Sequence, residues 1–379
     1  MKNYDAIIIG AGHNGLTNAA YLAKAGLNVI VVEKNDYIGG AAVSREMHEG
    51  WIYSSCSYVC SMMRQSLHRD LDLSRHGLLL VPYLGTVNFA DDGRTLRAYH
   101  NSEAYYLELK RHSSHDADSM SRFQADLTRY SQFIRKTLLR TPPDPTSFRP
   151  RDIFELIFLA KQIWLLGEKE IYEYIRFFTM SAAEFLDDYF ENDLIRASMA
   201  SAGIIGTALG VHSPGSSYIL LHHVMGDVDG SIGAWGLARG GMGAISNAIA
   251  GALKEHGGEI RTNAGVEQIL VKNGKATGVV LEGGEEIYAR IVVSNLDAKR
   301  TFTKIMDKND LPDGIYEKAK NFKIRGSSGK VNIALSGLPK FNGVPDNPYI
   351  NRGGQAFTGS RSEERRVGKE CRSRLSPDQ

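Results

Sequence analysis

The chain has 379 residues, with 45 basic and 43 acidic side chains and a formal net charge of +2. Its length and its 42% apolar content suit a large protein with two domains. The pI of about 8.3 is no sign of a nucleic acid or an anionic membrane as partner, because the excess positive charge lies within residues 361–379. We therefore expect no nucleic-acid partner.

The first predicted element is a buried strand, and a glycine-rich turn leads from it directly into a helix. Residues 6–9 are all apolar, and three glycines follow with dinucleotide-binding spacing. The first permits a tight turn, the second lets backbone approach a pyrophosphate, and the third lets the helix pack close to the sheet. The helix N-terminus offers its N–H groups to phosphates. The predicted phosphate turn comprises Gly10, Ala11, Gly12, His13, Asn14 and Gly15.

Residues 27–32, apolar apart from Asn28, predict the next buried strand, which ends at Glu33. An acid at this position can accept hydrogen bonds from both hydroxyls of an adenosine ribose. It also repels a 2′-phosphate, so FAD or NAD is favoured over NADP. We place Glu33 and the adjacent Lys34 in the predicted cofactor site.

A glycine pair, Gly39 and Gly40, follows shortly after Glu33. The stretch from Glu33 to Gly40 resembles the first half-site of flavoproteins of the amine oxidase and carotenoid desaturase kind. In that family the pair brings backbone against the pyrophosphate, which implies that Gly39, Gly40 and Ala41 contact the cofactor. Many relatives carry an arginine after the pair, so Ala41 implies that a cationic contact is absent or supplied from elsewhere.

Residues 235–293 predict a glycine-rich turn, a helix, a strand and an antiparallel meander, with hairpin turns at 273–274 and 283–284. A meander in place of a crossover helix resembles FAD domains of the glutathione-reductase type. By that resemblance, the backbone of Val266 contacts adenine, while Ser294 and Asn295 return towards the cofactor.

Residues 5–58 and 235–297 together resemble the phytoene desaturase-related FAD oxidoreductases, in particular the subgroup called pyridine nucleotide-disulfide oxidoreductase domain-containing protein 2. This resemblance implies an α/β fold: a Rossmann-type FAD-binding domain of the glutathione-reductase type, an inserted α+β substrate domain, and C-terminal truncation. The expected parts are FAD-binding domain 1–80 and 230–298, substrate domain 81–229 and 299–358, and a non-native tail 359–379.

The expected substrate domain contains helices at 103–111 and 117–135, an apolar helix at 153–167 and a strand at 330–336. The apolar helix is too short to span a bilayer. We interpret it as a core helix of this domain. The alternative is a lid at a membrane surface through which a lipid enters, and hence a peripheral membrane contact.

Two side-chain pairs invite a chemical role. Cys56 and Cys60 lack the C-x-x-C spacing of a redox pair, so we interpret them as small buried residues in a reducing compartment. His222 and His223 have no ligands of suitable spacing nearby, so we interpret them as structural and predict no metal site.

Residues 361–374 closely resemble the translation of a common sequencing adapter, which is why we expect a non-native tail. Relatives end in a further glycine-rich FAD segment, and nothing after Asn295 matches it, so we expect a fragment with an incomplete flavin pocket. The first strand begins close to Met1, which predicts no leader peptide and a cytoplasmic location.

The chemistry implied by resemblance is hydride transfer from an unknown apolar substrate to the flavin of an FAD-dependent oxidoreductase. No catalytic residue, electron acceptor or oligomeric state is indicated. Two alternatives stay open. An NAD-dependent dehydrogenase is disfavoured by the Gly39–Gly40 pair and the meander, and no sequence feature separates a non-catalytic regulatory flavoprotein from an enzyme.

Overall fold

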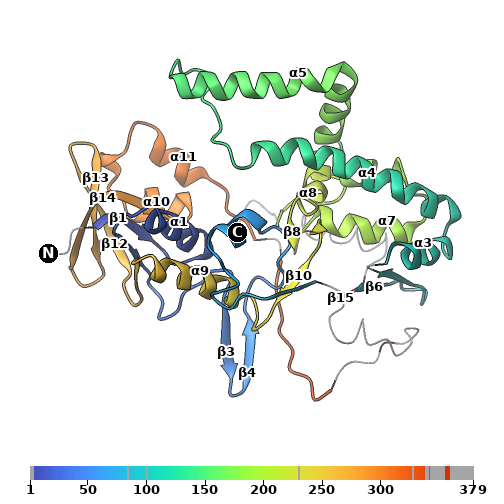
Figure 1. Cartoon of the computed structure of the whole chain (residues 1–379), viewed down its shortest axis with the longest axis horizontal. Coiled ribbons are helices and arrows are strands. Elements are labelled where there is room, and N and C mark those ends of the chain that lie inside the picture. The colour runs from blue at the N-terminus through green and yellow to red at the C-terminus, as the bar shows by residue number, and fades with distance from the viewer. Residues whose placement is uncertain are drawn as a thin grey trace, which may run out of the picture. The chain divides into compact units, whose positions relative to one another are not determined.

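The computed structural model describes residues 4–82, 85–99, 101–228, 231–326, 328–337, 341 and 355–358. The chain divides into two compact units (Figure 1). Unit 1 takes its described residues from Met1–Val81, Trp235–Arg325 and Gly329–Ala334, and unit 2 from Pro82–Ala234, Gly326–Ser328 and Leu335–Gln379. The expected tail at 359–379 lies outside the described residues.

Unit 1 is built on a six-stranded mixed sheet in the order β11-β2-β1-β14-β13-β12. Strands β11, β2, β1 and β14 are parallel neighbours, and β14 continues into an antiparallel meander with β13 and β12. This is the Rossmann-type arrangement expected from the sequence. The strands are β1 (Tyr4–Ile9), β2 (Val29–Val32), β11 (Glu259–Arg261), β12 (Val266–Lys272), β13 (Lys275–Leu281) and β14 (Glu286–Ser294).

Two helices of unit 1, α1 (His13–Lys24) and α9 (Gly243–Glu255), share the larger of its two cores. Their buried faces carry small residues, such as Ala19 and Ala20 on α1 and Ala248 on α9, so the helices can pack closely. The remaining elements of unit 1 are β3 (Ser44–His48), β4 (Trp51–Ser54), α2 (Gln65–Asp70), β5 (Leu80–Pro82), β10 (Gly236–Ala238), α10 (Ala298–Lys304), the 3₁₀ turn η2 (Lys308–Asp310) and α11 (Ile315–Asn321). The last residue of β5, Pro82, falls in unit 2.

The division of the chain differs from the expected one after residue 298. Residues 299–325 belong to unit 1, and Thr301 and Ile305 connect this segment to the sheet. Ile305 lies in the core beside the meander, and its carbonyl accepts the N–H of Ile269 at 2.7 Å. The hydroxyls of Thr301 and Ser294 lie 2.8 Å apart.

Unit 2 combines helices with a three-stranded sheet in the order β15-β6-β7. Its core is a cluster of aromatic rings, in which Phe123, Tyr130, Phe177 and Phe185 stack or meet edge to face. The elements are β6 (Gly85–Phe89), β7 (Thr95–Tyr99), α3 (Ser102–Lys110), α4 (Ser114–Thr137), α5 (Pro150–Thr179), α6 (Ala182–Asp187), α7 (Asp193–Ala200), η1 (Ser201–Gly203), α8 (Ser216–His222), β8 (Asp227–Val228), β9 (Ser231–Ile232) and β15 (Gln355–Thr358).

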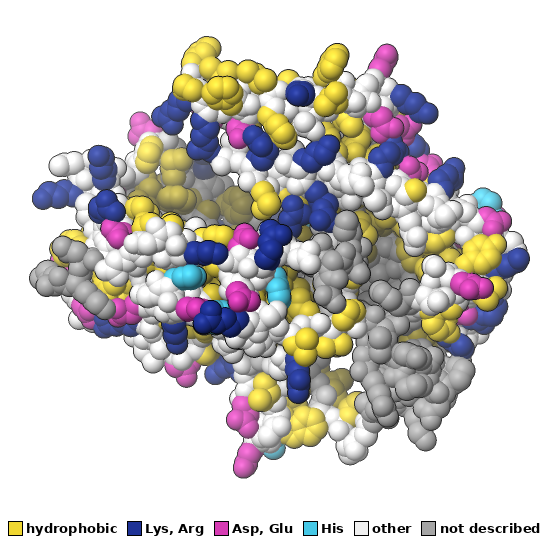
Figure 2. Space-filling model, viewed as in Figure 1, with side chains coloured by type: hydrophobic (Ala, Val, Ile, Leu, Met, Phe, Trp, Pro, Cys, Tyr) yellow, Lys and Arg dark blue, Asp and Glu magenta, His cyan; other side chains and the backbone are white. Residues whose placement is uncertain are grey.

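The interpretation of residues 153–167 as a core helix is wrong. Helix α5 is interrupted at Gly167, whose φ of 77° and ψ of 166° break the helical geometry. The part after Gly167 enters the core through Tyr174 and Phe177, whereas from the part before it the half-buried Leu166 packs against that core. Before Gly167 no residue of α5 is buried. The periodicity predicted the helix, but could not show that its face with Phe154, Ile157 and Trp164 is exposed. Figure 2 shows hydrophobic side chains gathered over this helix, at the top of the view.

The strand expected at 330–336 is also wrong. Residues 328–337 contain neither helix nor strand, and Val331, Ile333 and Leu335 are 81%, 69% and 52% exposed. An alternating apolar pattern needs a neighbouring strand and a core to become a strand, and among the described residues no strand pairs with this segment. Within the described part of the chain, no helix is both long enough and apolar enough to cross a membrane.

Candidate functional site

The residues predicted to bind a cofactor gather where three parallel strands of unit 1 end. The phosphate turn follows β1, Glu33 follows β2, and Asn295 follows β14, whose Ser294 is paired with Ile9 of β1. Ligands of open α/β sheets bind at such carboxyl ends. The fold therefore brings these segments, far apart in the sequence, to one edge of the sheet (Figure 1).

Glu33 is buried, and both oxygens of its carboxylate accept hydrogen bonds. The N–H of Ala11 donates to Oε2 at 2.8 Å, which ties the acid to the phosphate turn. Asn35 donates to Oε1 from its backbone N–H at 3.0 Å and from its side chain at 2.8 Å. A carboxylate has about four acceptor positions, so capacity remains for a further donor such as a ribose hydroxyl.

The glycines of the turn are required by close contacts within the protein. A methyl group at Gly15 would lie 2.3 Å from the carbonyl oxygen of Gly10, so any larger residue would push α1 away from the turn. A methyl group at Gly12 would lie 2.9 Å from Nδ2 of Asn295, and one at Gly15 would lie 3.0 Å from the same atom. Gly10 itself has a φ of 94°, which favours glycine.

Asn295 thus lies directly over the phosphate turn. Its backbone N–H donates to the carbonyl of Ile9 at 2.9 Å, which extends the β1–β14 pairing by one step. Its side-chain amide fills the space that the missing Cβ atoms of Gly12 and Gly15 leave open. The amide supplies two donors at the place where the first-turn N–H groups of α1 converge.

The second glycine pair lies against the phosphate turn. Gly39 and Gly12 form an isolated parallel bridge, and the N–H of Gly39 donates to the carbonyl of Ala11 at 2.8 Å. Gly39 and Gly40 have φ of 114° and 58°, and a methyl group at Gly40 would lie 3.0 Å from the Cα of Gly12. Ala41 is exposed beside them.

Three serines that we did not predict hold α9 against this region. Ser54 Oγ accepts the N–H of Met242 at 2.9 Å, and Ser44 Oγ accepts that of Gly243 at 3.0 Å, so hairpin hydroxyls cap the start of α9. Ser246 donates to the carbonyl of Ala42 at 2.7 Å. Sequence gives little sign of such contacts, because serine is common and the partners lie about two hundred residues apart.

The N-terminus of α1 carries the chemistry that a phosphate needs. Gly12 provides no side-chain cap, and the first turn of α1 holds no acidic residue, so the N–H groups of this turn stay open to a phosphate. His13 lies in this turn, and its Nδ1 is buried with no hydrogen-bond partner in the described part of the chain. Burial lowers the pKa of His13, so its imidazole is neutral near pH 7.

The other predicted residues contribute less direct contacts. Lys34 forms an exposed ion pair with Glu282 at 3.0 Å. Val266 begins β12 and is half-buried, while Ser294 Oγ contacts Thr301 and accepts the N–H of Leu296 at 3.3 Å. These residues border the site, and nothing in the structure tests their expected contacts with a cofactor.

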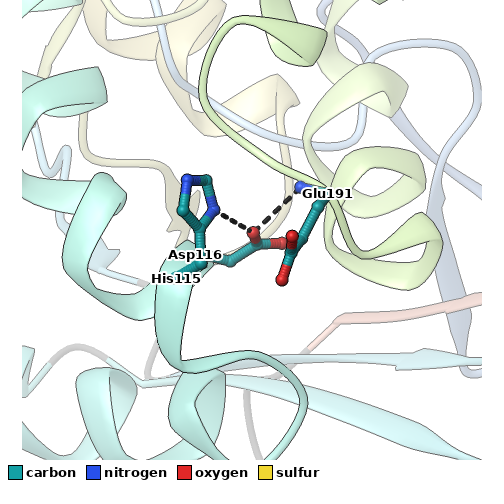
Figure 3. Close-up of side chains that lie close together, drawn as sticks. All are labelled: His115, Asp116 and Glu191. Carbon is teal, nitrogen blue, oxygen red and sulfur yellow. Dashed lines mark hydrogen bonds and ion pairs between the residues drawn. The ribbon is translucent and has the colours of Figure 1, made fainter.

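One group of side chains in unit 2 has the composition of a metal site: His115, Asp116 and Glu191 (Figure 3). The buried Asp116 is already occupied, because its two oxygens accept the backbone N–H groups of Glu191 and Asn192, each at 2.9 Å, and His115 lies 3.1 Å away. Asp116 therefore ties the start of α4 to the segment before α7. We assign no ion to this group.

The two side-chain pairs considered from sequence behave differently. Cys60 is buried, as expected, but Cys56 is exposed, so the interpretation of both as buried residues is wrong for Cys56, and both are free thiols. His223 is buried and its Nδ1 lies 2.9 Å from the carbonyl of Ile219, which fits a structural role. His222 meets the ring of Tyr218 edge-on.

A cavity of about 350 Å³ lies within unit 2 between α4, α5 and the segment containing α6. Arg129 lines it, and its guanidinium pairs with Asp126 at 2.9 Å and with Glu170. Tyr189 donates to Asp126 at 2.7 Å. These charged walls do not suit an apolar substrate, so we do not assign this cavity to one.

The sheet, the phosphate turn and the acid after β2 define a Rossmann-type dinucleotide-binding protein. The sequence pattern of the family described as "Flavin containing amine oxidoreductase" matches residues 15–366, so the chain belongs to that family. The cofactor is accordingly FAD, and an NAD-dependent dehydrogenase is not favoured.

Known proteins agree with this assignment. Over 361 residues the chain is 34% identical to rat (Rattus norvegicus) pyridine nucleotide-disulfide oxidoreductase domain-containing protein 2, covering 91% of this chain and 62% of that protein. It is 28% identical over 312 residues to a neurosporene-forming phytoene desaturase of Rhodobacter capsulatus, covering 80% and 55%. The chain thus spans about three fifths of the length of such relatives.

A solved structure shows the same fold. Putrescine oxidase bound to putrescine matches with a TM-score of 0.53 at 18% identity, over 84% of this chain and 63% of that one. At this identity the likeness establishes the flavoprotein fold, and nothing more specific.

Proposed function

We propose that the chain is the cofactor-binding part, with much of the substrate-binding part, of an FAD-dependent oxidoreductase. The observation that carries this proposal is the uncapped N-terminus of α1, placed beside Glu33 and under the amide of Asn295. The positive end of the α1 dipole and its open N–H groups suit a diphosphate, and the buried Glu33 suits the ribose joined to it.

Each part of the site takes a defined role. The N–H groups of the first turn of α1 and the Asn295 amide donate to the diphosphate, and His13 Nδ1 provides a further neutral partner. Glu33 accepts from the adenosine ribose with the capacity that Ala11 and Asn35 leave. The proposed cofactor-binding residues are Gly10, Ala11, Gly12, His13, Asn14, Gly15, Glu33, Lys34, Gly39, Gly40, Ala41, Val266, Ser294 and Asn295.

When bound, FAD supplies the capacity to accept a hydride from a substrate C–H. The chain's contribution is to bind and orient the cofactor and to keep water from it. The serine contacts at the start of α9 serve this role, because they hold the Gly241–Gly243 segment against the hairpin that follows Gly39 and Gly40. No side chain is assigned an acid or base role.

An apolar substrate is the second part of the proposal. It is supported by the likeness to a phytoene desaturase, whose named substrate is a hydrocarbon. Such a substrate partitions into membranes, so we also propose a peripheral membrane contact. A cytoplasmic location is consistent with the free thiols of Cys56 and Cys60, since disulfides are rare in reducing compartments.

The test is a titration of the purified protein with FAD, followed by flavin fluorescence and by the absorbance spectrum. We expect saturable binding that Asn295→Ala weakens by about tenfold, as loss of one hydrogen bond to a charged group implies. Lys308→Gln, an exposed residue outside the proposed cofactor-binding set, serves as control and should change the affinity little. Binding of NAD in preference to FAD, or unchanged FAD affinity in Asn295→Ala, would contradict the proposed site.

A further inference from the structure

The strand order of unit 1 places three segments in a row at the carboxyl edge of its sheet. The phosphate turn follows β1, Glu33 follows β2, and residues 262–266 follow β11. These three strands are parallel neighbours, and adjacent strands of a sheet lie about 4.8 Å apart. The base and the diphosphate of a nucleotide are joined to different ends of its ribose. A nucleotide with its diphosphate at β1 and its ribose at β2 therefore directs its base towards residues 262–266.

Residues 262–266 are fixed to the segment of Glu33 by backbone hydrogen bonds. The N–H of Ala264 donates to the carbonyl of Glu33 at 2.8 Å, and the N–H of Asn263 donates to the carbonyl of Asn35 at 2.9 Å. Asn263 has a φ of 52°, which turns the chain after β11. The path of residues 262–266 is therefore set relative to Glu33 by the protein itself.

The carboxylate of Glu282 lies against this segment. The backbone N–H of Glu282 donates to the carbonyl of Gly265 at 2.7 Å. A methyl group at Gly265 would lie 2.6 Å from Glu282 Oε2 and 2.9 Å from Oε1, so the carboxylate occupies the space that the missing side chain leaves. Oε1 accepts from Lys34 Nζ at 3.0 Å, whereas none of the described residues donates a hydrogen bond to Oε2.

A carboxylate at this place distinguishes between bases by the group at their C6 position. An ionised carboxylate can only accept hydrogen bonds, and Oε2 has that capacity free. Adenine carries an amino group at C6, which donates, whereas guanine and hypoxanthine carry an oxygen there, which accepts. An acceptor that faces another acceptor repels it and leaves both without a donor. The side chain of Glu282 is 54% exposed, so water weakens this discrimination without removing it.

We infer that Glu282 recognises the C6 amino group of adenine and so selects an adenine nucleotide, while Lys34 holds the other oxygen of its carboxylate. This role of Glu282 rests on the proposed function, because it needs the diphosphate at α1 and the ribose at Glu33. Glu282 adds a selectivity that neither of those contacts provides, since a diphosphate and a ribose are the same whichever base they carry.

The experiment measures by flavin fluorescence how ADP and IDP compete with FAD for the purified 379-residue chain. The two nucleotides differ at C6 of the base, where IDP has an oxygen in place of the amino group. We expect ADP to bind about tenfold more tightly than IDP, as one hydrogen bond to a half-exposed charged group implies. Glu282→Gln should bring the two affinities within about twofold of each other, because an amide can both accept and donate.

A second variant moves the carboxylate without removing its charge. Gly265→Ala should also abolish the preference for ADP, because its methyl group would displace a carboxylate oxygen that lies 2.6 Å away. The displaced group is the end of a flexible side chain, so we expect this variant to fold. The control is Glu286→Gln on β14, an exposed acid that accepts from the hydroxyl of Tyr288, and it should keep the preference of the parent.

The ratio of the two affinities is insensitive to a general loss of folded protein, because such a loss weakens the apparent binding of both nucleotides equally. Equal affinities of the parent for ADP and IDP would overturn the role of Glu282 while FAD binding still supported the proposed function. A preference for ADP that persists in Glu282→Gln or in Gly265→Ala would overturn it as well. If the parent binds neither FAD nor ADP, the proposed function fails, and the role of Glu282 fails with it.

Discussion

Replacing Glu33 by Gln tests whether the acid after β2 organises the phosphate turn before any cofactor binds. The side chain keeps its size but exchanges one acceptor oxygen for an amide. With Oε1 retained towards Asn35, the new N–H group would face the N–H of Ala11, which now donates to Oε2 at 2.8 Å. Two donors would meet, and the Ala11 N–H would lose its partner in a buried place.

A buried donor without a partner costs about 1–3 kcal/mol, and the two bonds to Asn35 lose their charge assistance as well. We therefore expect the free energy of unfolding to fall by about 2–3 kcal/mol. The same change removes the charged acceptor for a ribose, so FAD affinity should fall about ten- to hundredfold. Glu33→Ala should lower FAD affinity over the same range.

The assay is urea denaturation of parent and variant without FAD, followed by an FAD titration. The free energies of unfolding are compared with the same dependence on urea concentration for both proteins. Lys308→Gln is the matched control, because its ion pair with Glu317 is exposed and contributes little. Ordinary surface substitutions change the free energy of unfolding by up to about 0.5 kcal/mol. If Glu33→Gln changes it by no more than that, the carboxylate does not hold the turn. Reduced stability with unchanged FAD affinity would leave Glu33 a structural residue only.

Three further outcomes are expected. Gly15→Ala should lower the free energy of unfolding in urea by at least about 1 kcal/mol, because the methyl group would lie 2.3 Å from a backbone oxygen. Alanine favours helices, so the matched control is Asn18→Ala at an exposed position of the same helix. Equal effects of the two substitutions would refute the close packing at Gly15. Gly12→Ala should lower the free energy of unfolding less in an Asn295→Ala background, because the contact of the new methyl group with Asn295 Nδ2 at 2.9 Å is then gone. Additive effects of the two substitutions in this double-mutant cycle would contradict that contact. The free energy of unfolding should fall as the pH drops below about 6.5. Burial lowers the pKa of His13, His112 and His222, so in this pH range the unfolded chain binds more protons than the folded protein. His13→Gln should weaken the dependence of the urea midpoint on pH, and an unchanged dependence would count against a buried neutral His13.

Much of the cofactor-binding fold could be predicted from local pattern. The apolar runs before Gly10 and Glu33 are strands because a buried parallel strand needs an unbroken apolar stretch. The Asn273–Gly274 pair lies in the hairpin turn between β12 and β13, since its residues accept positive φ; the observed values are 51° and 72°. These features depend on neighbours in the sequence, so the sequence alone determined them.

Contacts between distant segments were decided only in the tertiary structure. That Asn295 fills the space beside Gly12, and that Ser44 and Ser54 cap α9, depends on the pairing of β1 with β14 and on the path of the β3–β4 hairpin. The outward face of α5 is of the same kind: the helix follows from its periodicity, but whether an apolar face is covered depends on what packs against it. A local pattern states which residues can be buried, and only the assembled chain decides which of them are.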